Sequence, residues 1–502
     1  MRLDVFAAAL CVAGPIWAQP IFEPRPISDH IYGGPWEFFV GGGLASFDCN
    51  GDGLPEILAA GGQNPAQLFL NLSAGTVAFE AHDSALGVTG VTGSYPLDID
   101  SDGNLDVVML RVGQNRLFLG RGDCTFEASE LLPLSEDGRW TTAFSATWEV
   151  DARLPTLAFG NYVDRSNPDG PFGACDANLL YRPDDWAYPP PSLLEPGYCA
   201  LSMLFTDWAR QGRADLRVSN DRHYYGREGA EQLWAMEASP RLYTQADGWE
   251  RHQLWGMGIA SQDITGDGLP EVYLTSMGDQ RLQFRDPSLE SPTYTDAPFD
   301  RGVTAHRPYT GGDERPSTGW HPAFGDMDND GWVDLFVTKG NVEEMPGAAM
   351  EDPNNLLRGQ PDGTFAEVGL EAGISSMARS RGAVLADFNA DGLLDIAVVN
   401  RNAPMEVFEN VTESDGAWLS VDLRQTGPNP NAIGAYVDVR AGEMLWTQER
   451  TIGGGHAGGQ AGPLHFGLAD AATVDVTVHW PNGGVTDFPA LPVNQRLILE
   501  RP

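Results

Sequence analysis

One nine-residue pattern occurs five times in this chain of 502 residues. It begins with aspartate, places oxygen-bearing side chains at its third and fifth positions and glycine at its sixth, and ends on a carboxylate that opens an apolar run. We call the copies loops one to five; they span residues 48–56, 98–106, 263–271, 326–334 and 387–395. Five copies on a repeating period constrain the fold, the metal and the compartment together.

The pattern meets the requirements of Ca²⁺, which takes about six to eight oxygen ligands at roughly 2.4 Å. Side chains at positions 1, 3 and 5, the carbonyl at position 7 and the carboxylate at position 9 would form the cage. The glycine at position 6 permits the positive φ that reverses the chain. The predicted ligands are Asp48, Asn50, Asp52, Leu54 and Glu56; Asp98, Asp100, Asp102, Asn104 and Asp106; Asp263, Thr265, Asp267, Leu269 and Glu271; Asp326, Asp328, Asp330, Trp332 and Asp334; and Asp387, Asn389, Asp391, Leu393 and Asp395.

Two other interpretations of the loops are less favoured. An EF-hand needs glutamate at position 12 and flanking helices, but position 12 is Ala59 in loop one and Met109 in loop two, within runs typical of strands. Ordinary Asp/Asn/Gly turns would not repeat the same ligand positions five times. Loops two and four hold four carboxylates each and the others three, so charge count predicts the tightest binding at the sites that begin at Asp98 and Asp326.

The spacing of the loops indicates two further units between loops two and three. Residues 146–159 align with loop one but lack its ligands, and residues 207–215 keep the end carboxylates and the glycine while placing Ala209 and Gln211 at positions 3 and 5. Seven units therefore begin near residues 48, 98, 148, 207, 263, 326 and 387. Only five are expected to carry metal.

Each unit contains four predicted strands, which favours a propeller. Third strands such as residues 67–71 and 406–410 are followed by turns into a fourth, except that the last unit runs from Asn410 directly into a new domain. The N-terminal segment 21–27 resembles the other fourth strands, so we expect it to complete the last blade. The predicted fold is all-β: a seven-bladed β-propeller followed by a small β-rich, sandwich-like C-terminal domain.

The loops and the third-strand motifs resemble the FG-GAP/VCBS repeats of integrin-type propellers. The tail resembles the ASPIC/UnbV domain through residues 418–423, 431–435, 453–456, 464–468 and 474–483. The combination resembles the cartilage-acidic-protein-like family and its bacterial members. The resemblance implies an extracellular calcium-binding propeller over residues 20–416 and an ASPIC/UnbV-like domain over residues 417–502, with about five mainly structural Ca²⁺ ions and no established catalytic residues.

The net charge of −39 disfavours nucleic acid, whose phosphates require Lys and Arg, and acidic membrane surfaces. It favours solubility and cationic partners. Residues 1–18 have Arg2, a short apolar stretch and small residues, as a secretory signal peptide has, and no other apolar run is long enough to span a bilayer. We therefore expect a secreted, periplasmic or extracellular protein.

Four cysteines remain after the signal peptide, which suits an oxidising compartment. Cys175 and Cys199 bracket a proline-rich insertion that a bridge would hold, and Cys49 and Cys124 lie in turns expected on the same propeller face. These two pairs are the predicted disulfides. The alternative is four free buried thiols.

One axial position departs from the repeats. Five residues before each loop stand Gly43, Gly93, Ala143, Ser202, Gly258, His321 and Gly382, and all but the histidine are small, as crowding near an axis demands. His321, with Trp320 and Arg381, is therefore the candidate ligand or metal site at the channel mouth; the favoured alternative is that His321 fills space and bonds a neighbouring strand. Residues 222–226 are a weaker polar candidate. His456 and His465 lie in the glycine-rich tail, where a second polar site is one interpretation and a structural role is the favoured one.

Two functions remain. The first is a secreted calcium-stabilised binding, adhesion or scaffold module for protein or glycan partners. The second is an enzyme of lyase or oxidoreductase type near His321, since a fold does not decide function. The absence of a nucleophile elbow, phosphate loop, zinc signature or dinucleotide fingerprint favours binding over catalysis.

Overall fold

Nearly all the regular secondary structure of the described chain is β-strand, as expected. The computed structural model describes residues 18–134, 138–167, 174–221, 229–304, 307–309 and 313–502. The helical elements in these residues are α1 (Gly369–Ala372) and the 3-10 turns η1 (Trp36–Phe38), η2 (Gln245–Asp247) and η3 (Phe299–Arg301). The predicted signal peptide lies outside the described residues except for its last position.

Seven antiparallel sheets occupy residues 22–410 of the described chain, each built from four strands. One sheet gains a short fifth strand, β32 (Gln460–Ala461), which pairs parallel to β2. The first five sheets along the chain contain β2 (Leu44–Phe47), β3 (Glu56–Ala59), β4 (Gln67–Asn71) and β5 (Phe79–His82); β6 (Val91–Leu97), β7 (Asp106–Arg111), β8 (Arg116–Gly120) and β9 (Phe126–Ser129); β10 (Thr141–Thr147), β11 (Thr156–Asn161), β12 (Asn178–Tyr181) and β13 (Ser192–Leu194); β14 (Ala200–Thr206), β15 (Asp215–Asn220), β16 (Gln232–Ala235) and β17 (Arg241–Leu242); and β18 (Gly256–Gln262), β19 (Glu271–Ser276), β20 (Arg281–Arg285) and β21 (Tyr294–Asp296).

The last two of these sheets close a ring. They contain β22 (Gly319–Gly325), β23 (Asp334–Lys339), β24 (Asn355–Gly359) and β25 (Phe365–Glu367); and β26 (Arg379–Ala386), β27 (Asp395–Arg401), β28 (Glu406–Asn410) and β1 (Phe22–Arg25). The first strand of each sheet contacts the first strand of the next, and β26 contacts β2. This is a propeller-like arrangement, in which every sheet buries its faces against its neighbours.

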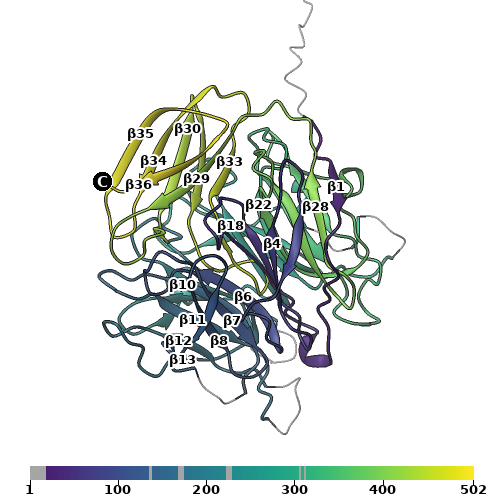
Figure 1. The fold of residues 1–502 in the computed structure, drawn as a ribbon, viewed down its shortest axis with the longest axis vertical. Helices are drawn as coiled ribbons and strands as arrows, with labels where there is room; N and C mark the ends of the chain where they lie inside the picture. The colour runs from purple at the N-terminus through teal and green to yellow at the C-terminus, as the bar shows by residue number, and fades with distance from the viewer. Residues whose placement is uncertain (1–17, 135–137, 168–173, 222–228, 305–306, 310–312) are drawn as a thin grey trace, which may run out of the picture.

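The N-terminal strand supplies the outer strand of the last sheet. β1 pairs antiparallel with β28, from Phe22 opposite Asn410 to Arg25 opposite Val407, and the two strands lie side by side in Figure 1. Phe22 is buried in a cluster that includes Phe336, Leu356 and Phe408. The two ends of the ring are therefore joined by main-chain hydrogen bonds as well as by side-chain packing.

The C-terminal residues form two further sheets that pack face to face. Their orders are β33–β29–β36 and β31–β30–β34–β35, and the inward side chains form one buried cluster around Leu419, Val437 and Val476. The strands, grouped at one side of the ring in Figure 1, are β29 (Trp418–Arg424), β30 (Tyr436–Ala441), β31 (Met444–Glu449), β33 (Leu464–Gly467), β34 (Thr473–His479), β35 (Val485–Pro492) and β36 (Gln495–Glu500).

One segment of the C-terminal part enters the centre of the ring. We call residues 452–461 the axial segment. It bridges in turn to the first strands β10, β14, β18, β6 and β2, through partners that are Ala146, Leu204, Ile259, Ser94 and Ser46. The side chain of Gln460 also bonds both main-chain groups of Leu385 on β26.

This segment explains two of the axial glycines. A Cβ atom at Gly43 would lie 1.7 Å from the carbonyl oxygen of Ala457, and one at Gly93 would lie 1.9 Å from the same oxygen. Both distances are far below van der Waals contact, so any side chain there would displace the axial segment. Crowding at the axis thus comes in part from a distant piece of the chain.

Replacing Phe22 by alanine should lower the free energy of unfolding by about 3 kcal/mol, because a buried aromatic ring is lost and a cavity remains. Urea unfolding followed by tryptophan fluorescence would measure the change. The matched control is Ile21→Ala, because the neighbouring Ile21 side chain is 50% exposed. Equal losses for both variants would contradict the role of β1 in closing the ring.

Candidate metal sites and the axial cluster

The five loops share one hydrogen-bond scheme at their first position. In loop two, Asp98 accepts hydrogen bonds from the main-chain N–H groups of Asp102 and Gly103 at 3.1 and 3.0 Å. The first aspartates of the other loops accept from the equivalent glycine at 2.7 to 2.9 Å, which is Gly53, Gly268, Gly331 and Gly392. The left-handed φ of this glycine directs its N–H inward in every loop. Main-chain hydrogen bonds alone therefore wrap each loop around its first carboxylate.

The closing carboxylate ties each loop to its sheet. In loop two, the two oxygens of Asp106 accept from the N–H groups of Ile99 and Gly120, both at 2.8 Å. Asp334 and Asp395 repeat this arrangement in loops four and five. One partner lies in the loop and the other ends the third strand, so one carboxylate joins three consecutive chain segments.

Two loops gather three carboxylates at the separation a cation needs. Ligand oxygens of Asp98, Asp100 and Asp106 lie within 4.8 Å of one another, and so do those of Asp326, Asp328 and Asp334. These are the two loops with four carboxylates. In loop four, Oδ1 of the fully buried Asp328 has no hydrogen-bond partner among the described residues, which fits an oxygen that could bind a cation.

Loops one, three and five carry an amide or hydroxyl at the third position. Nδ2 of Asn50 donates to Asp52 and Glu56, and Nδ2 of Asn389 donates to Asp391. In loop three, Thr265 lies against Asp263. An amide that donates inward must turn its oxygen toward a cation to act as a ligand, so loops one and five need a side-chain rotation that loops two and four do not.

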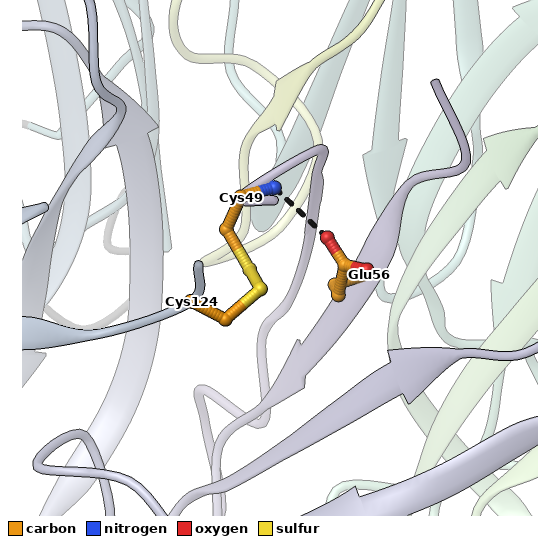
Figure 2. A group of neighbouring side chains, drawn as sticks. All are labelled: Cys49, Glu56 and Cys124. Carbon is orange, nitrogen blue, oxygen red and sulfur yellow. Dashed lines mark hydrogen bonds between the residues drawn. A yellow bond between two sulfur atoms is a disulfide. The ribbon is translucent and has the colours of Figure 1, made fainter. Parts of the chain in front are cut away.

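A third group of potential ligands is already bonded internally. Cys49, Glu56 and Cys124 lie close together, but Figure 2 shows the two sulfur atoms joined to each other while the Cys49 N–H donates to Glu56 at 2.8 Å. Cys175 and Cys199 form a second bridge. Both predicted pairings are disulfides in the structure, and the first links loop one to the turn after β8.

Burial raises the pKa of the loop carboxyls. It raises the pKa of Asp98 to about 6 and that of Asp106 to about 8, and it raises those of Asp326 and Asp334 well above the usual range. Neighbouring carboxylates add to the effect through like-charge repulsion. A bound divalent cation would offset both the desolvation and the repulsion, because its positive charge stabilises the ionised carboxylates and so lowers their pKa values.

An arginine already partly neutralises loop four. The guanidinium of Arg358 on β24 bonds Asp328 at 2.7 Å and Asp330 at 2.8 Å. In loop two the nearest guanidinium belongs to Arg121, 3.9 Å from Asp102 and half exposed. Counting carboxylates alone therefore overstates the net negative charge of loop four.

Arginine side chains also pair with carboxylates in the two units that lack the full set of metal ligands. At the loop of residues 207–215, Asp215 accepts from Trp208 and Tyr243 and pairs with Arg213 at 3.0 Å. In the preceding unit, Arg182 pairs with Glu149 at 2.7 Å. One carboxylate in each unit that lacks the full ligand set is thus paired with a guanidinium.

His321 lies at the axis and bonds the axial segment. Its Nδ1 accepts from the N–H of His456 at 3.0 Å, and a Cβ atom at Gly455 would lie 2.2 Å from its ring. The ring of His456 in turn lies between Met257 O, 2.9 Å from Nδ1, and Gly41 N, 3.2 Å from Nε2. Burial lowers the pKa of His321 to about 4 and that of His456 to about 3, so both rings are neutral near pH 7.

Trp320 and Arg381 make internal contacts as well. The guanidinium of Arg381 stacks on the Trp320 ring with a separation of 4.0 Å and donates to the carbonyls of Phe39, Ser380 and Val342. The indole of Trp320 donates to Gly340 O at 2.7 Å. The structure brings together the three residues singled out in the sequence, but in contact with the protein's own chain. The polar candidate at residues 222–226 lies outside the described residues.

Comparison with protein families gives two matches. Residues 48–109 match the FG-GAP-like repeat, and residues 425–502 match the family described as ASPIC and UnbV. The chain carries an FG-GAP-like repeat and an ASPIC and UnbV domain. These domains indicate a propeller-type module, in agreement with the closed ring of sheets.

Curated relatives are named cartilage acidic protein 1. The mouse and human proteins are each 27% identical over 161 residues, which is 30% of this chain and 22% of theirs. The Xenopus tropicalis protein is 33% identical over 87 residues, covering 17% of this chain and 12% of that protein. The matched region thus spans about a fifth or less of the relatives' length.

Two solved structures resemble the chain distantly. BBS1N, solved in complex with ARL6DN, has a TM-score of 0.44 at 8% identity and covers 78% of this chain and 97% of its own. An Agrocybe aegerita protein that recognises non-reducing terminal N-acetylglucosamine has a TM-score of 0.39 at 13% identity, covering 74% and 94%.

The sequence patterns do not identify every side chain that the sites use. They do not identify Arg358 and Arg213, although each lies within a repeat unit and carries the charge that its neighbouring loop needs. They predict a structural role for His456 but not its place in the fold. The sequence does contain a signal for its location. Glycines surround His456, and such a run suits a segment that passes through the crowded centre of the ring.

Protonation of the axial histidines should weaken the fold. Because the pKa of His321 is lower in the folded chain than its ordinary value of about 6.5, stability is lost as pH falls from about 6.5 toward 4. The His321→Asn variant should lack this component, which amounts to roughly 3 kcal/mol at most. Urea unfolding of both proteins at pH 7.5 and pH 4.5 would show the wild type losing more stability than the variant.

The matched control is Ser202→Ala, which changes the equivalent axial position on β14, where the side chain does not titrate. Its difference from the wild type should be the same at both pH values. A pH-independent difference for His321→Asn would contradict the assignment of a neutral, buried His321.

Proposed function

We propose that this protein is a calcium-binding β-propeller that acts outside the cell as a binding, adhesion or scaffold module for protein or glycan partners. The observation that carries the proposal is the pair of three-carboxylate groups at Asp98 and Asp326, embedded in a loop pattern that recurs five times. The proposed domains are a propeller over residues 20–416 and an ASPIC/UnbV-like domain over residues 417–502.

The donor set supports calcium. Carboxylate, amide and main-chain oxygens are ligands of hard cations, and the described groups of three carboxylates contain no thiol or imidazole. We assign one ion to each of the five loops, held by positions 1, 3, 5, 7 and 9. A bound ion would supply the positive charge that the buried carboxylates lack. Charge count favours loop two as the tightest site, because Arg358 offsets part of the charge in loop four.

The ions would be mainly structural. Each loop connects the first and second strands of a sheet, and in loops two, four and five the closing carboxylate also holds the end of the third strand. A cation at positions 1 to 9 would fix this junction in five of the seven sheets. Stability of the ring should therefore depend on calcium.

A location outside the cell is supported by the two disulfides, which persist in oxidising compartments. Millimolar extracellular Ca²⁺ would also fill sites of modest affinity. Among the described residues, no helix has both the length and the apolar composition to cross a membrane.

The enzymatic alternative at His321 has less support. His321 is 5% exposed, and its ring accepts a hydrogen bond from the axial segment. Arg381 and Trp320 donate to main-chain carbonyls. A binding module needs no catalytic group at the axis, so we base the proposal on binding.

Calcium should raise the melting temperature, and a chelator should lower it. At a calcium concentration one hundred times the dissociation constant, one site adds about 2.7 kcal/mol to the free energy of unfolding. Isothermal titration should give about five sites per chain, and Asp98→Asn should remove one. The control is Asp207→Asn, which changes the equivalent first residue in the unit without ligands and should leave the stoichiometry unchanged. A melting temperature insensitive to chelator would contradict the structural role.

Partner binding should depend on the same ions. A glycan array and a panel of purified extracellular proteins, each probed with the mature chain in Ca²⁺ and in EGTA, should show binding that the chelator abolishes. Asp207→Asn should bind like the wild type. Failure to bind any glycan or protein in Ca²⁺ would contradict the proposal.

A further inference from the structure

The C-terminal part lies directly on loop four. Residues 326–331 and 334 are all buried, although they form a surface-type loop between two strands. Trp446 Nε1 donates to Gly331 O at 2.9 Å, and the N–H of Ala469 donates to Asn329 O at 3.1 Å. These two bonds hold the backbone at the fourth and sixth positions, where the loop reverses.

The cover extends to a predicted ligand. A Cβ atom at Gly467 would lie 1.9 Å from Oδ2 of Asp326, so β33 passes against the first carboxylate of the loop. Ser414 Oγ donates to Asp328 O, and Nε2 of His465 lies 3.0 Å from Oδ1 of Asn329. Loop four is thus enclosed by residues 414–469 of the C-terminal side.

Loop two has the same carboxylates but no such cover. Asp102 and Gly103 are exposed, and a Cβ atom at Gly103 would meet nothing within 4 Å. In the described chain, loop two has no hydrogen bond or ion pair to residues 417–502. The two loops therefore form a natural comparison: equal carboxylate number, one enclosed and one open.

Enclosure has an electrostatic consequence. Docking the C-terminal part removes water from Asp326, Asp328 and Asp334, all of which are 5% exposed or less. Arg358 pairs with Asp328 and Asp330 but not with Asp326 or Asp334. Burying unpaired carboxylates is costly, and within the part of the chain that the structure describes Oδ1 of Asp328 has no hydrogen-bond partner. A cation in loop four would remove this cost and so favour docking.

We propose that the loop-four metal site is built by both domains: Trp446, Gly467 and Ala469 hold the loop in its ligand geometry, so that cation binding at loop four and docking of the C-terminal domain stabilise each other, whereas loop two binds independently. The proposal rests on the proposed calcium function and concerns which residues control one of its sites. By linkage, a change in the docking contact must alter the affinity for the cation by the same factor that the cation alters docking.

The first test is the affinity of loop four in Trp446→Phe. This variant keeps the ring but removes the indole N–H that donates to Gly331. Terbium(III), a calcium substitute, is titrated into the chelator-treated full chain. Its emission is excited by energy transfer from Trp332, which belongs to loop four itself. The part of the emission that is lost in Trp332→Phe is the signal of loop four. The affinity of loop four for terbium should fall about two- to tenfold in Trp446→Phe, the range of one hydrogen bond. The heat of calcium binding at loop two, which is the heat that Asp98→Asn removes, should not change.

The matched control is Trp480→Phe. Trp480 is buried in the same C-terminal core, and its indole donates to Thr486 rather than to a loop. Its terbium affinity at loop four should equal that of the wild type. Equal affinities for Trp446→Phe and Trp480→Phe would overturn the proposal.

A second test follows docking in the wild-type chain. Amide hydrogen exchange should speed up in the axial segment and in β33 when EGTA removes the ions, and calcium should restore protection. Gly467→Ala, whose methyl group would collide with Asp326, should show the fast pattern even in calcium. Gly462→Ala is the control, because a Cβ atom there would meet nothing within 4 Å. Protection that is unaffected by EGTA would overturn the coupling.

The outcomes separate the two proposals. In one outcome, the wild type shows neither the terbium emission excited through Trp332 nor the calcium-binding heat that Asp98→Asn removes. In that case the calcium function itself is refuted, and the coupling is refuted with it. If both appear, but Trp446→Phe and Gly467→Ala behave like their controls, calcium binding stands and only the two-domain character of loop four is refuted.

Discussion

The architecture depends on a buried carboxylate that begins six of the seven second strands in the described ring. Its two oxygens accept main-chain N–H groups from the preceding loop and from the end of the third strand, as Asp106, Asp334 and Asp395 show. Asp215 keeps the bond to the third-strand end in a unit that has lost most metal ligands. The carboxylate is therefore a backbone connector first, and its remaining lone pairs make the same atom available to a cation. Structure and metal chemistry share one residue.

Neighbouring sheets are joined by an equally local device. The asparagine that ends a third strand donates both to the carbonyl before its own closing carboxylate and to the second residue of the preceding sheet's loop: Asn71 reaches Pro55 and Phe388, and Asn410 reaches Leu394 and Met327. Each Nδ2 is thus used inside the protein, so these asparagines join neighbouring sheets. Loop, sheet and neighbouring sheet form one network in which a cation at one loop would stabilise two sheets.

Much of this was predictable because it is encoded locally. The loop spacing, the glycine at position 6 and the apolar run after position 9 identify strands and turns within ten residues, and the Cys49–Cys124 pairing follows once two turns are placed on one face. The axial cluster was not predictable in the same way. His321 and His456 are 135 residues apart, and no repeat periodicity relates them, because one belongs to the ring and the other to a different domain. Arg358 is not predictable for a related reason. The loop pattern specifies oxygen ligands at fixed positions, whereas a guanidinium that neutralises their negative charge can lie at any position close in space.

The axial segment also bears on how the chain can be made. Residues 22–25 cannot pair until residues 406–410 exist, and the small axial residues of the ring have their final neighbours only when residues 452–461 arrive. During synthesis or export from the N-terminus, the first six sheets of the ring are made before β1 can pair with β28, and the axial segment follows only after the whole ring has been made. The nascent protein must therefore keep a ring with an unfilled centre soluble until residues 452–461 emerge, and a chain that stops short of the axial segment would leave that centre exposed to chaperones and proteases.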